Sequence, residues 1–245
     1  MLNIIRAELY RFRNSGGFLY YMAAVAVLGI LTIFSIDLNA LDADLGTTMF
    51  NMAQFVYSLI LLGSGTLLTI FVGIAYNNRM GYYEIMSGNA PHKIILSKVL
   101  SLGLISSLII YIPTAAFLAF TYFRNGKGEA EEPVMLFILL FVITLHLTVS
   151  FILYAMLGRN LVLASFVPYI RFGLLDLIVY MLISQEFEKF QDSKLLFLTT
   201  NSQMANLTRL AGNKDLITVI ILTSVIECTV LYVLVYLVYK NKKFK

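Results

Sequence analysis

Residues 134–157 read VMLFILLFVITLHLTVSFILYAML and give the clearest indication of the fold. This stretch contains no Asp, Glu, Lys or Arg, and its only histidine is His146. At 1.5 Å per residue, a helix of this length crosses the roughly 30 Å hydrocarbon core of a bilayer. The stretch therefore predicts a membrane-spanning helix.

The rest of the chain repeats this pattern. Of 245 residues, 59% are hydrophobic and only 13% are charged, and the mean hydropathy is +0.82. Soluble domains carry roughly 25% charged residues, so this composition excludes an ordinary water-soluble fold. We expect an all-α, polytopic membrane protein in which residues 1–245 form a single domain of six transmembrane helices. The further spans are predicted at 18–36, 53–76, 94–123, 161–183 and 216–239.

The basic residues predict the orientation of these spans, because short cytoplasmic loops collect Lys and Arg. Of the 18 Lys and Arg residues, most fall on one side of the six predicted spans: Arg6, Arg11, Arg13, Arg79, Lys93, Lys98, Arg159, Lys240, Lys242, Lys243 and Lys245. We therefore expect both termini in the cytoplasm. The net charge of +4 is spread over short connections, which does not favour nucleic acid as a partner.

The N-terminal segment 1–17 has the pattern of an amphipathic helix. Its apolar residues gather on one side of a helical wheel with two arginines beside them: Leu2, Ile5, Leu9 and Phe12, with Arg6 and Arg13. One interpretation is an interfacial helix whose apolar side enters the lipid while the arginines bind headgroups. The other is a plain basic flank to the first span.

The longest predicted cytoplasmic connection, NNRMGYYEIMSGNAPHK at 77–93, combines aromatic, apolar and charged residues. Tyr, Met and Arg are enriched in protein interfaces, so we expect this loop to dock on a cytoplasmic partner, with anchoring at the membrane surface as the alternative. The residues assigned to docking are Arg79, Gly81, Tyr82, Tyr83, Glu84, Ile85, Pro91, His92 and Lys93.

Charged residues inside predicted spans are the most specific local feature, since each costs roughly 2.5–3.5 kcal/mol at mid-helix. Arg171 and Asp176 fall in the fifth span and Glu227 in the sixth. Arg171 and Glu227 lie at similar predicted depth, which favours an interhelical pair that fixes packing over a polar site on a transport path. For His146 we favour a hydrogen-bonded packing role over a proton relay, because no second histidine is near. Cys228, the only cysteine, is expected to be a packing residue.

The outer connection 184–215 is polar at both ends and apolar at LLFL, residues 195–198. An apolar patch inside an extracellular loop predicts that the loop turns back toward the membrane.

Taken as a whole layout, the chain resembles the six-span permeases of type II ABC exporters, which include small permeases for drug, bacteriocin-immunity and peptide-toxin efflux. The features that carry the resemblance are the amphipathic N-terminal helix, the six spans, and a second-to-third-span loop with Arg79, Gly81, Glu84, Pro91 and Lys98. The chain departs from the family pattern at Asn77-Asn78 and at His92, where an acidic and a basic residue are common.

The resemblance implies several properties of this chain. Residues 77–93 would form a coupling helix that binds an ABC ATPase subunit, and 184–215 would include short re-entrant helices. Two permease chains, identical or different, would form one pathway with two ATPase copies in a bacterial plasma membrane. The substrate would be an amphipathic peptide, with a peptide antibiotic or toxin favoured, or a hydrophobic small molecule. No G-x-x-x-x-G-K-[ST] loop is present, so ATP and Mg²⁺ would be bound by the separate ATPase chain and no cofactor by this one.

Other classes of function are weaker. An intramembrane enzyme needs clustered ligands or an acid–base pair, such as H-E-x-x-H, and the only two histidines are His92 and His146. A secondary transporter is expected to show inverted repeats, which the sequence does not reveal. A membrane protein that gives immunity or acts as a scaffold without transport remains the main alternative to an exporter subunit.

Overall fold

The structure is a computed structural model of the whole chain. It describes residues 2–14, 43–50, 52–53, 56–58, 61, 72, 88–128, 130–158, 166–186 and 198–241. Within these ranges the protein is helical and contains no strand.

The longest helix is formed by three consecutive elements: α5 (Pro91–Lys98), η2 (Val99–Gly103) and α6 (Leu104–Asn125). Pro91 occupies the first turn, where its missing N–H costs no hydrogen bond. The helix ends at Gly126, whose φ of 86° suits glycine best. Residues 91–125 are long and apolar enough to cross a membrane, as predicted for 94–123. Sequence reasoning missed the π-helical turn of η2.

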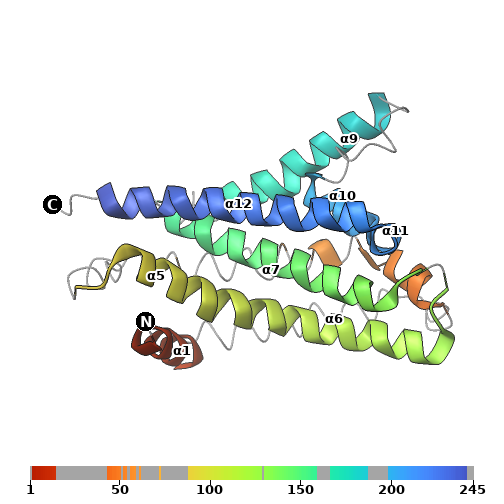
Figure 1. Cartoon of the computed structure of the whole chain (residues 1–245), viewed down its shortest axis with the longest axis horizontal. Coiled ribbons are helices and arrows are strands. Elements are labelled where there is room, and N and C mark those ends of the chain that lie inside the picture. Colours follow the sequence, from red (N-terminus) through yellow and green to blue (C-terminus); the bar gives the residue numbers. More distant parts are fainter. Residues whose placement is uncertain are drawn as a thin grey trace.

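Two further helices have the length and composition of membrane spans: α7 (Pro133–Leu157) and α12 (Lys214–Asn241). They confirm the predictions for 134–157 and 216–239. α7 is apolar on all sides, and such a helix is stable only when it is surrounded. It accordingly lies between α6 and α12 (Figure 1). α12 is apolar on its outer side, where Leu222 and Val225 are more than half exposed.

The other three predicted spans are described in part or not at all. Residues 18–36 lie outside the described residues, and of 53–76 only a few helical positions are described. The described part of 161–183 contains η3 (Tyr169–Leu175), a π-helix, and then α9 (Asp176–Glu186). The count of six spans therefore stays a prediction, and three helices that can cross a membrane are established among the described residues.

The second half of the predicted outer loop contains two short helices, α10 (Thr200–Ala205) and α11 (Leu207–Ala211). Both pack against α7, and their mixed polar and apolar side chains are buried: Thr200, Asn201, Ser202, Gln203, Met204, Leu207, Leu210 and Ala211. This segment is therefore part of the bundle's interior. Its location outside the membrane, as a re-entrant segment, stays a prediction.

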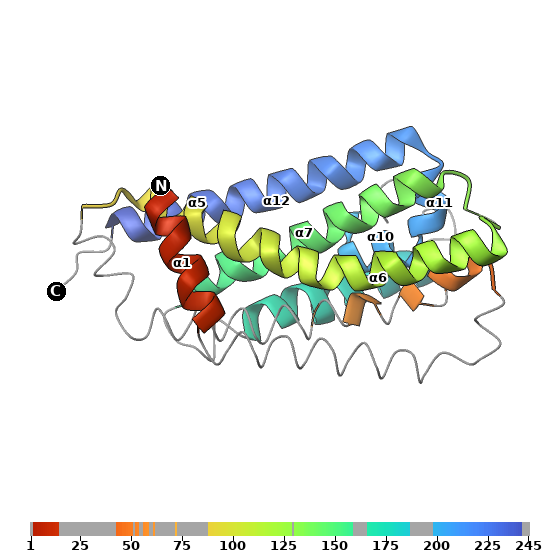
Figure 2. The same ribbon diagram turned by 90° about the horizontal axis from the view of Figure 1, so that it is seen from below.

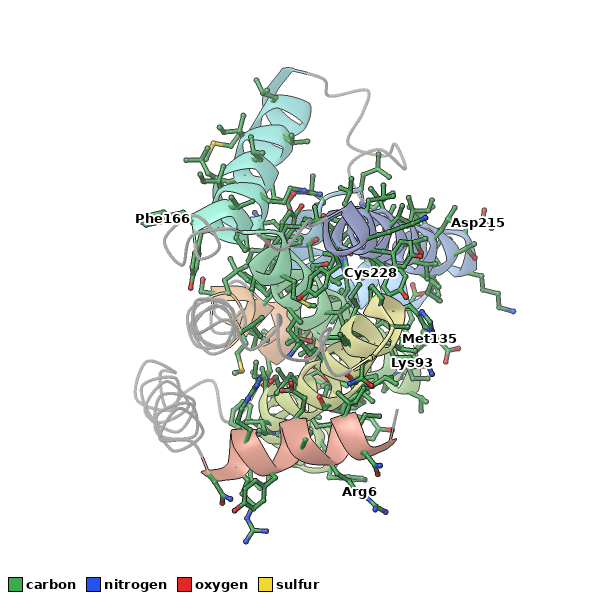
Figure 3. All side chains as sticks on the ribbon, turned by 90° about the vertical axis from the view of Figure 1, so that its left-hand side faces the viewer. Arg6, Lys93, Met135, Phe166, Asp215 and Cys228 are labelled. Atoms are coloured by element: carbon green, nitrogen blue, oxygen red, sulfur yellow. The ribbon has the colours of Figure 1, made fainter. Side chains whose placement is uncertain are left out.

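The N-terminal segment forms a helix, α1 (Leu2–Asn14), as its pattern predicts. α1 crosses the beginning of α5 at the end of the bundle where α12 also finishes (Figure 2). Arg6 and Arg13 are exposed, and Arg6 points away from the bundle (Figure 3). Ile5 and Leu9 are half-buried. The placement of α1 at a membrane surface stays a prediction.

A close contact between η2 and α7 leads to the first testable prediction. A Cβ atom added to Gly103 would lie 3.2 Å from Cγ2 of Val149 and 3.6 Å from Cδ1 of Ile152, so Gly103→Leu forces the two helices apart. We expect it to lower the free energy of unfolding by about 1–3 kcal/mol. The temperature of unfolding in detergent measures this effect. The control is Gly173→Leu, because a Cβ at Gly173 meets no side chain of the described residues within 4 Å. Equal stability of the two variants would contradict the prediction.

Candidate functional site

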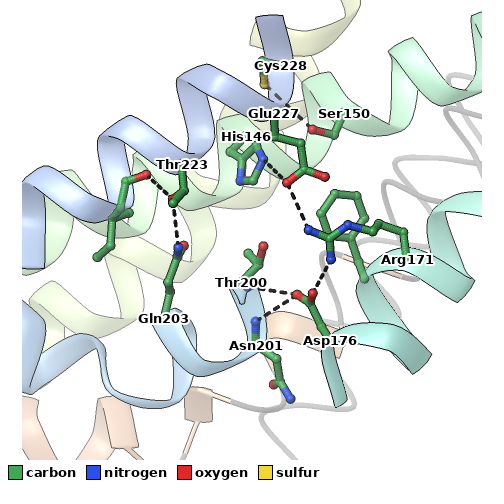
Figure 4. Close-up of polar contacts among 12 residues, drawn as sticks. His146, Ser150, Arg171, Asp176, Thr200, Asn201, Gln203, Thr223, Glu227 and Cys228 are labelled. Atoms are coloured by element: carbon green, nitrogen blue, oxygen red, sulfur yellow. Dashed lines mark hydrogen bonds and ion pairs between the residues drawn. The ribbon is translucent and has the colours of Figure 1, made fainter. Parts of the chain in front are cut away.

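The charged residues predicted inside the spans come together at one place in the bundle (Figure 4). Arg171 of η3 bonds to the carboxylate of Asp176 at the start of α9. Its other terminal nitrogen, Nη2, lies 3.3 Å from Oε2 of Glu227 on α12. His146 of α7 reaches the same oxygen, with its Nε2 also 3.3 Å away. The structure thus contains the predicted Arg171–Glu227 pair and extends it with Asp176 and His146. We call these four residues the charge cluster.

Asp176 joins the charge cluster to the short helix α10. Its Oδ2 accepts hydrogen bonds from the backbone N–H groups of Thr200, at 2.9 Å, and Asn201, at 3.4 Å. The first N–H groups of any helix lack partners within the helix, and a negative charge near them is favourable. Asp176 is only 1% exposed, so its charge depends on these donors and on Arg171. Sequence reasoning missed this contact because 24 positions separate Asp176 from Thr200.

The π-helix η3 carries Arg171. π-helical turns are rare and occur frequently at functional sites. The carbonyl oxygen of Phe172 accepts a 2.6 Å hydrogen bond from the hydroxyl of Tyr57, and the hydroxyl of Tyr169 donates to the carbonyl of Leu61 at 3.1 Å. The guanidinium of Arg171 also lies 5.2 Å from the centre of the Phe172 ring, a cation–π contact. The two tyrosine hydrogen bonds attach η3 to Tyr57 and Leu61, and the ring contact places the guanidinium of Arg171.

His146 is a buried member of the charge cluster whose ring nitrogens lack hydrogen bonds. It is 5% exposed, and the edge of the Phe172 ring packs against it with the ring centres 6.0 Å apart. Neither Nδ1 nor Nε2 has a hydrogen-bond partner among the described residues, and Nε2 makes only the 3.3 Å ionic contact to Glu227. The packing role expected for His146 therefore accounts for its contact with the Phe172 ring but does not account for its unpaired ring nitrogens.

Further polar side chains continue from the charge cluster along α12. Nε2 of Gln203 on α10 lies 3.3 Å from the hydroxyl of Thr223, and the hydroxyl of Ser150 on α7 lies 3.8 Å from the sulfur of Cys228. Cys228 is thus a packing residue with one polar contact. Among the described residues, no group of three His, Cys, Asp or Glu side chains is placed to hold a metal ion.

A second ionic site fastens α1 to α5. Nζ of Lys98 lies 2.6 Å from Oε1 of Glu8, and Nη2 of Arg11 lies 2.7 Å from Oε2 of the same carboxylate. The side chains of Lys98 and Glu8 are 4% and 3% exposed, so the pair is closed to solvent. A cavity of about 350 Å³ lies beside it, between α1 and Asn89. The sequence pattern placed Glu8 away from the apolar stripe and gave no partner for it.

The predicted docking residues are only partly described. Pro91 is half-buried, and His92 and Lys93 are exposed at the beginning of α5. The remaining ones lie outside the described residues: Arg79, Gly81, Tyr82, Tyr83, Glu84 and Ile85. The side chains of Leu2 and Phe12, predicted for the lipid side of α1, lie outside them as well.

No protein-family model matches this chain, and no curated protein matches it either. The function has to be argued from the two ionic sites and the helices that carry them.

Proposed function

We propose that this protein is the membrane-spanning permease subunit of an ATP-driven exporter of the type II ABC class. It would cross the membrane six times with both termini in the cytoplasm, and move amphipathic or hydrophobic molecules outward, with a peptide antibiotic or toxin as the favoured substrate. The observation that carries the proposal is the buried Lys98–Glu8 ion pair, which fixes α1 to the helix that follows the 77–93 loop.

The ion pair gives a physical route from the loop to the bundle. The last three residues of the predicted 77–93 loop, from Pro91, already belong to α5, and the helix continues without a break to Asn125. Its length is about 50 Å at 1.5 Å per residue. Because Glu8 and Lys98 are buried together, α1 has to move with the start of this helix. A partner that pulls on the loop would therefore displace α1 and one long helix as a unit. Helix shifts of this kind are a common means of conformational switching.

The partner would be a separate ATPase chain in two copies, which binds ATP and Mg²⁺ and changes the distance between two docked loops. A second permease chain, identical or different, would complete the pathway. Binding of ATP would favour one of two arrangements of the spans, as expected for alternating access. In this mechanism no residue of the permease forms a covalent bond.

The second prediction tests this proposal by association and ATP turnover. The chain is purified with candidate ATPase subunits, and Tyr82, Tyr83 and Glu84 are replaced together by alanine. We expect the wild-type chain to bind an ATPase, and the triple variant to lose most of the bound ATPase because the apolar and charged docking contacts are gone. The control is Lys127→Ala, an exposed residue just beyond the opposite end of α6.

The outcome separates the exporter from a non-transporting immunity or scaffold protein. An exporter subunit raises the ATPase rate when an amphipathic peptide is added. A chain that binds no ATPase, or a triple variant that binds it as well as the wild type does, contradicts the proposal.

A further inference from the structure

We infer that Glu227 in the charge cluster binds the positively charged group of an amphipathic molecule, a primary amine in the simplest case. The inference rests on the proposed transport function, since it names the substrate class of the same protein. It depends on the balance of charge in the cluster, on the unequal pairing of its two carboxylates, and on the apolar surroundings.

The cluster contains more negative than positive fixed charge. Two carboxylates, those of Asp176 and Glu227, share one guanidinium, that of Arg171. A net charge inside a bundle is costly unless a counter-charge reaches it. A cation that enters the cluster would therefore be attracted to it.

The two carboxylates are not paired equally. Asp176 is 1% exposed and has three donors, one from Arg171 and two from the start of α10. Glu227 has a side chain that is 20% exposed, and its two contacts, to Arg171 and His146, are both 3.3 Å long. Both contacts fall on Oε2, and no described residue donates a hydrogen bond to Oε1. Glu227 is thus the carboxylate with the capacity to accept a ligand.

His146 provides a second, independent indication of a ligand. It is 5% exposed and directed at Glu227, yet neither of its ring nitrogens has a hydrogen-bond partner among the described residues. A neutral imidazole has one N–H donor and one acceptor nitrogen, so His146 keeps an unused acceptor beside Glu227. Leaving a buried polar atom unpaired costs about 1–3 kcal/mol. An ammonium group has three donors and no acceptor, which matches the free acceptors of Glu227 and His146.

The surroundings favour an amphiphile over a small inorganic ion. On α12, Val230 lies one turn from Glu227 and is 53% exposed. On η3, Leu174 lies about one turn from Arg171 and is 54% exposed. Apolar side chains on both elements would contact an alkyl or apolar peptide segment whose charged end lies at Glu227. A small ion would gain nothing from them.

The third prediction tests this binding with the permease alone, in phosphatidylcholine nanodiscs, with dodecylamine as the probe and N-dodecylacetamide as its uncharged match. Ligand binding raises the unfolding temperature of the folded state. We expect the wild type to bind the amine about tenfold more tightly than the amide, the ratio that one charge-assisted hydrogen bond supplies. Glu227→Gln is expected to bind both equally. Glu227→Asp and the control Asp215→Asn, an exposed carboxylate on the same helix, keep the preference.

Three further arms make the outcome decisive. Methylamine and sodium chloride at the same concentration should not shift the unfolding temperature; a shift equal to that of dodecylamine would assign the site to small cations and overturn the inference. A hydrophobic carbodiimide should link dodecylamine to Glu227 of the wild type, as seen by peptide mass, so a Glu227→Gln variant that fails to fold does not stop the test. Equal binding of amine and amide by the wild type, or no link at Glu227, also overturns it. No ATPase is needed, so failure here is distinct from failure of the coupling proposal.

Discussion

Arg171→Leu is expected to produce a protein that unfolds at a much lower temperature than the wild type, or that fails to accumulate in folded form. The substitution removes the only guanidinium that contacts Asp176 and Glu227 in the described structure. Removal of one partner from a buried ion pair costs about 3–5 kcal/mol, because the remaining charge is left without compensation. Here two carboxylates lose their partner at once. Size-exclusion profiles and unfolding temperatures in mild detergent measure the effect.

Two companion variants identify the cause. Arg171→Leu combined with Glu227→Gln removes one of the uncompensated charges and should recover part of the lost stability. Arg124→Leu removes an exposed arginine near the end of α6 and should have a small effect, since exposed charges contribute about 0–1 kcal/mol. If Arg171→Leu is as stable as Arg124→Leu, the charge cluster does not stabilise the bundle.

The long apolar helices were predictable because their signal is local. Residues 134–157 contain an unbroken apolar run, and α7 ends within one residue of the predicted limits. Depth counted along each helix also indicated that Arg171 and Glu227 could face each other, because the rise per residue is constant. Both inferences use only spacing along the chain, and the structure confirms them.

The contacts that complete the charge cluster depend on information that spacing does not contain. A π-helical turn changes which side chains share a face, and nothing in YIRFGLL, residues 169–175, indicates it. The donors to Asp176 are backbone N–H groups of α10, and backbone groups are the same in every sequence. Asp176 was therefore recognised as a charge in a span, but its bond to α10 was not predicted.

The N-terminal helix is a second case in which a local pattern predicted the helix but not its long-range contact. Its amphipathic pattern predicted a helix, and the structure has one over Leu2–Asn14. The pattern suggested that the apolar stripe and the arginines make the contacts of this helix. In the structure, Glu8 is buried as well. A single acidic residue on a short helix has no sequence signal for burial, because its partner, Lys98, lies 90 positions further along the chain.

Lys98→Met is expected to detach α1 from the bundle. The side chain of Glu8 is 3% exposed. After the substitution it keeps its 2.7 Å contact with Arg11. Arg11 lies on α1 itself, so its bond to Glu8 does not hold α1 to α5. We expect a loss of about 1.5–3 kcal/mol in the free energy that docks α1, the usual contribution of a hydrogen bond between charged groups. Limited proteolysis before the first predicted span, followed by peptide mass, reports the detachment.

The matched control is Lys93→Met, which changes an exposed lysine on the same short helix and should leave α1 docked. The double variant Glu8→Gln with Lys98→Met should restore part of the protection, because no carboxylate is then buried between α1 and α5 and the partly exposed Arg11 can turn to solvent. If the ion pair transmits movement from the 77–93 loop, Lys98→Met should still bind the ATPase but lose the increase in ATP turnover caused by an amphipathic peptide. Protected α1 in Lys98→Met would show that apolar contacts alone hold the helix. Retained stimulation with α1 detached would show that α1 is a passive anchor and that the long helix responds to the loop without it.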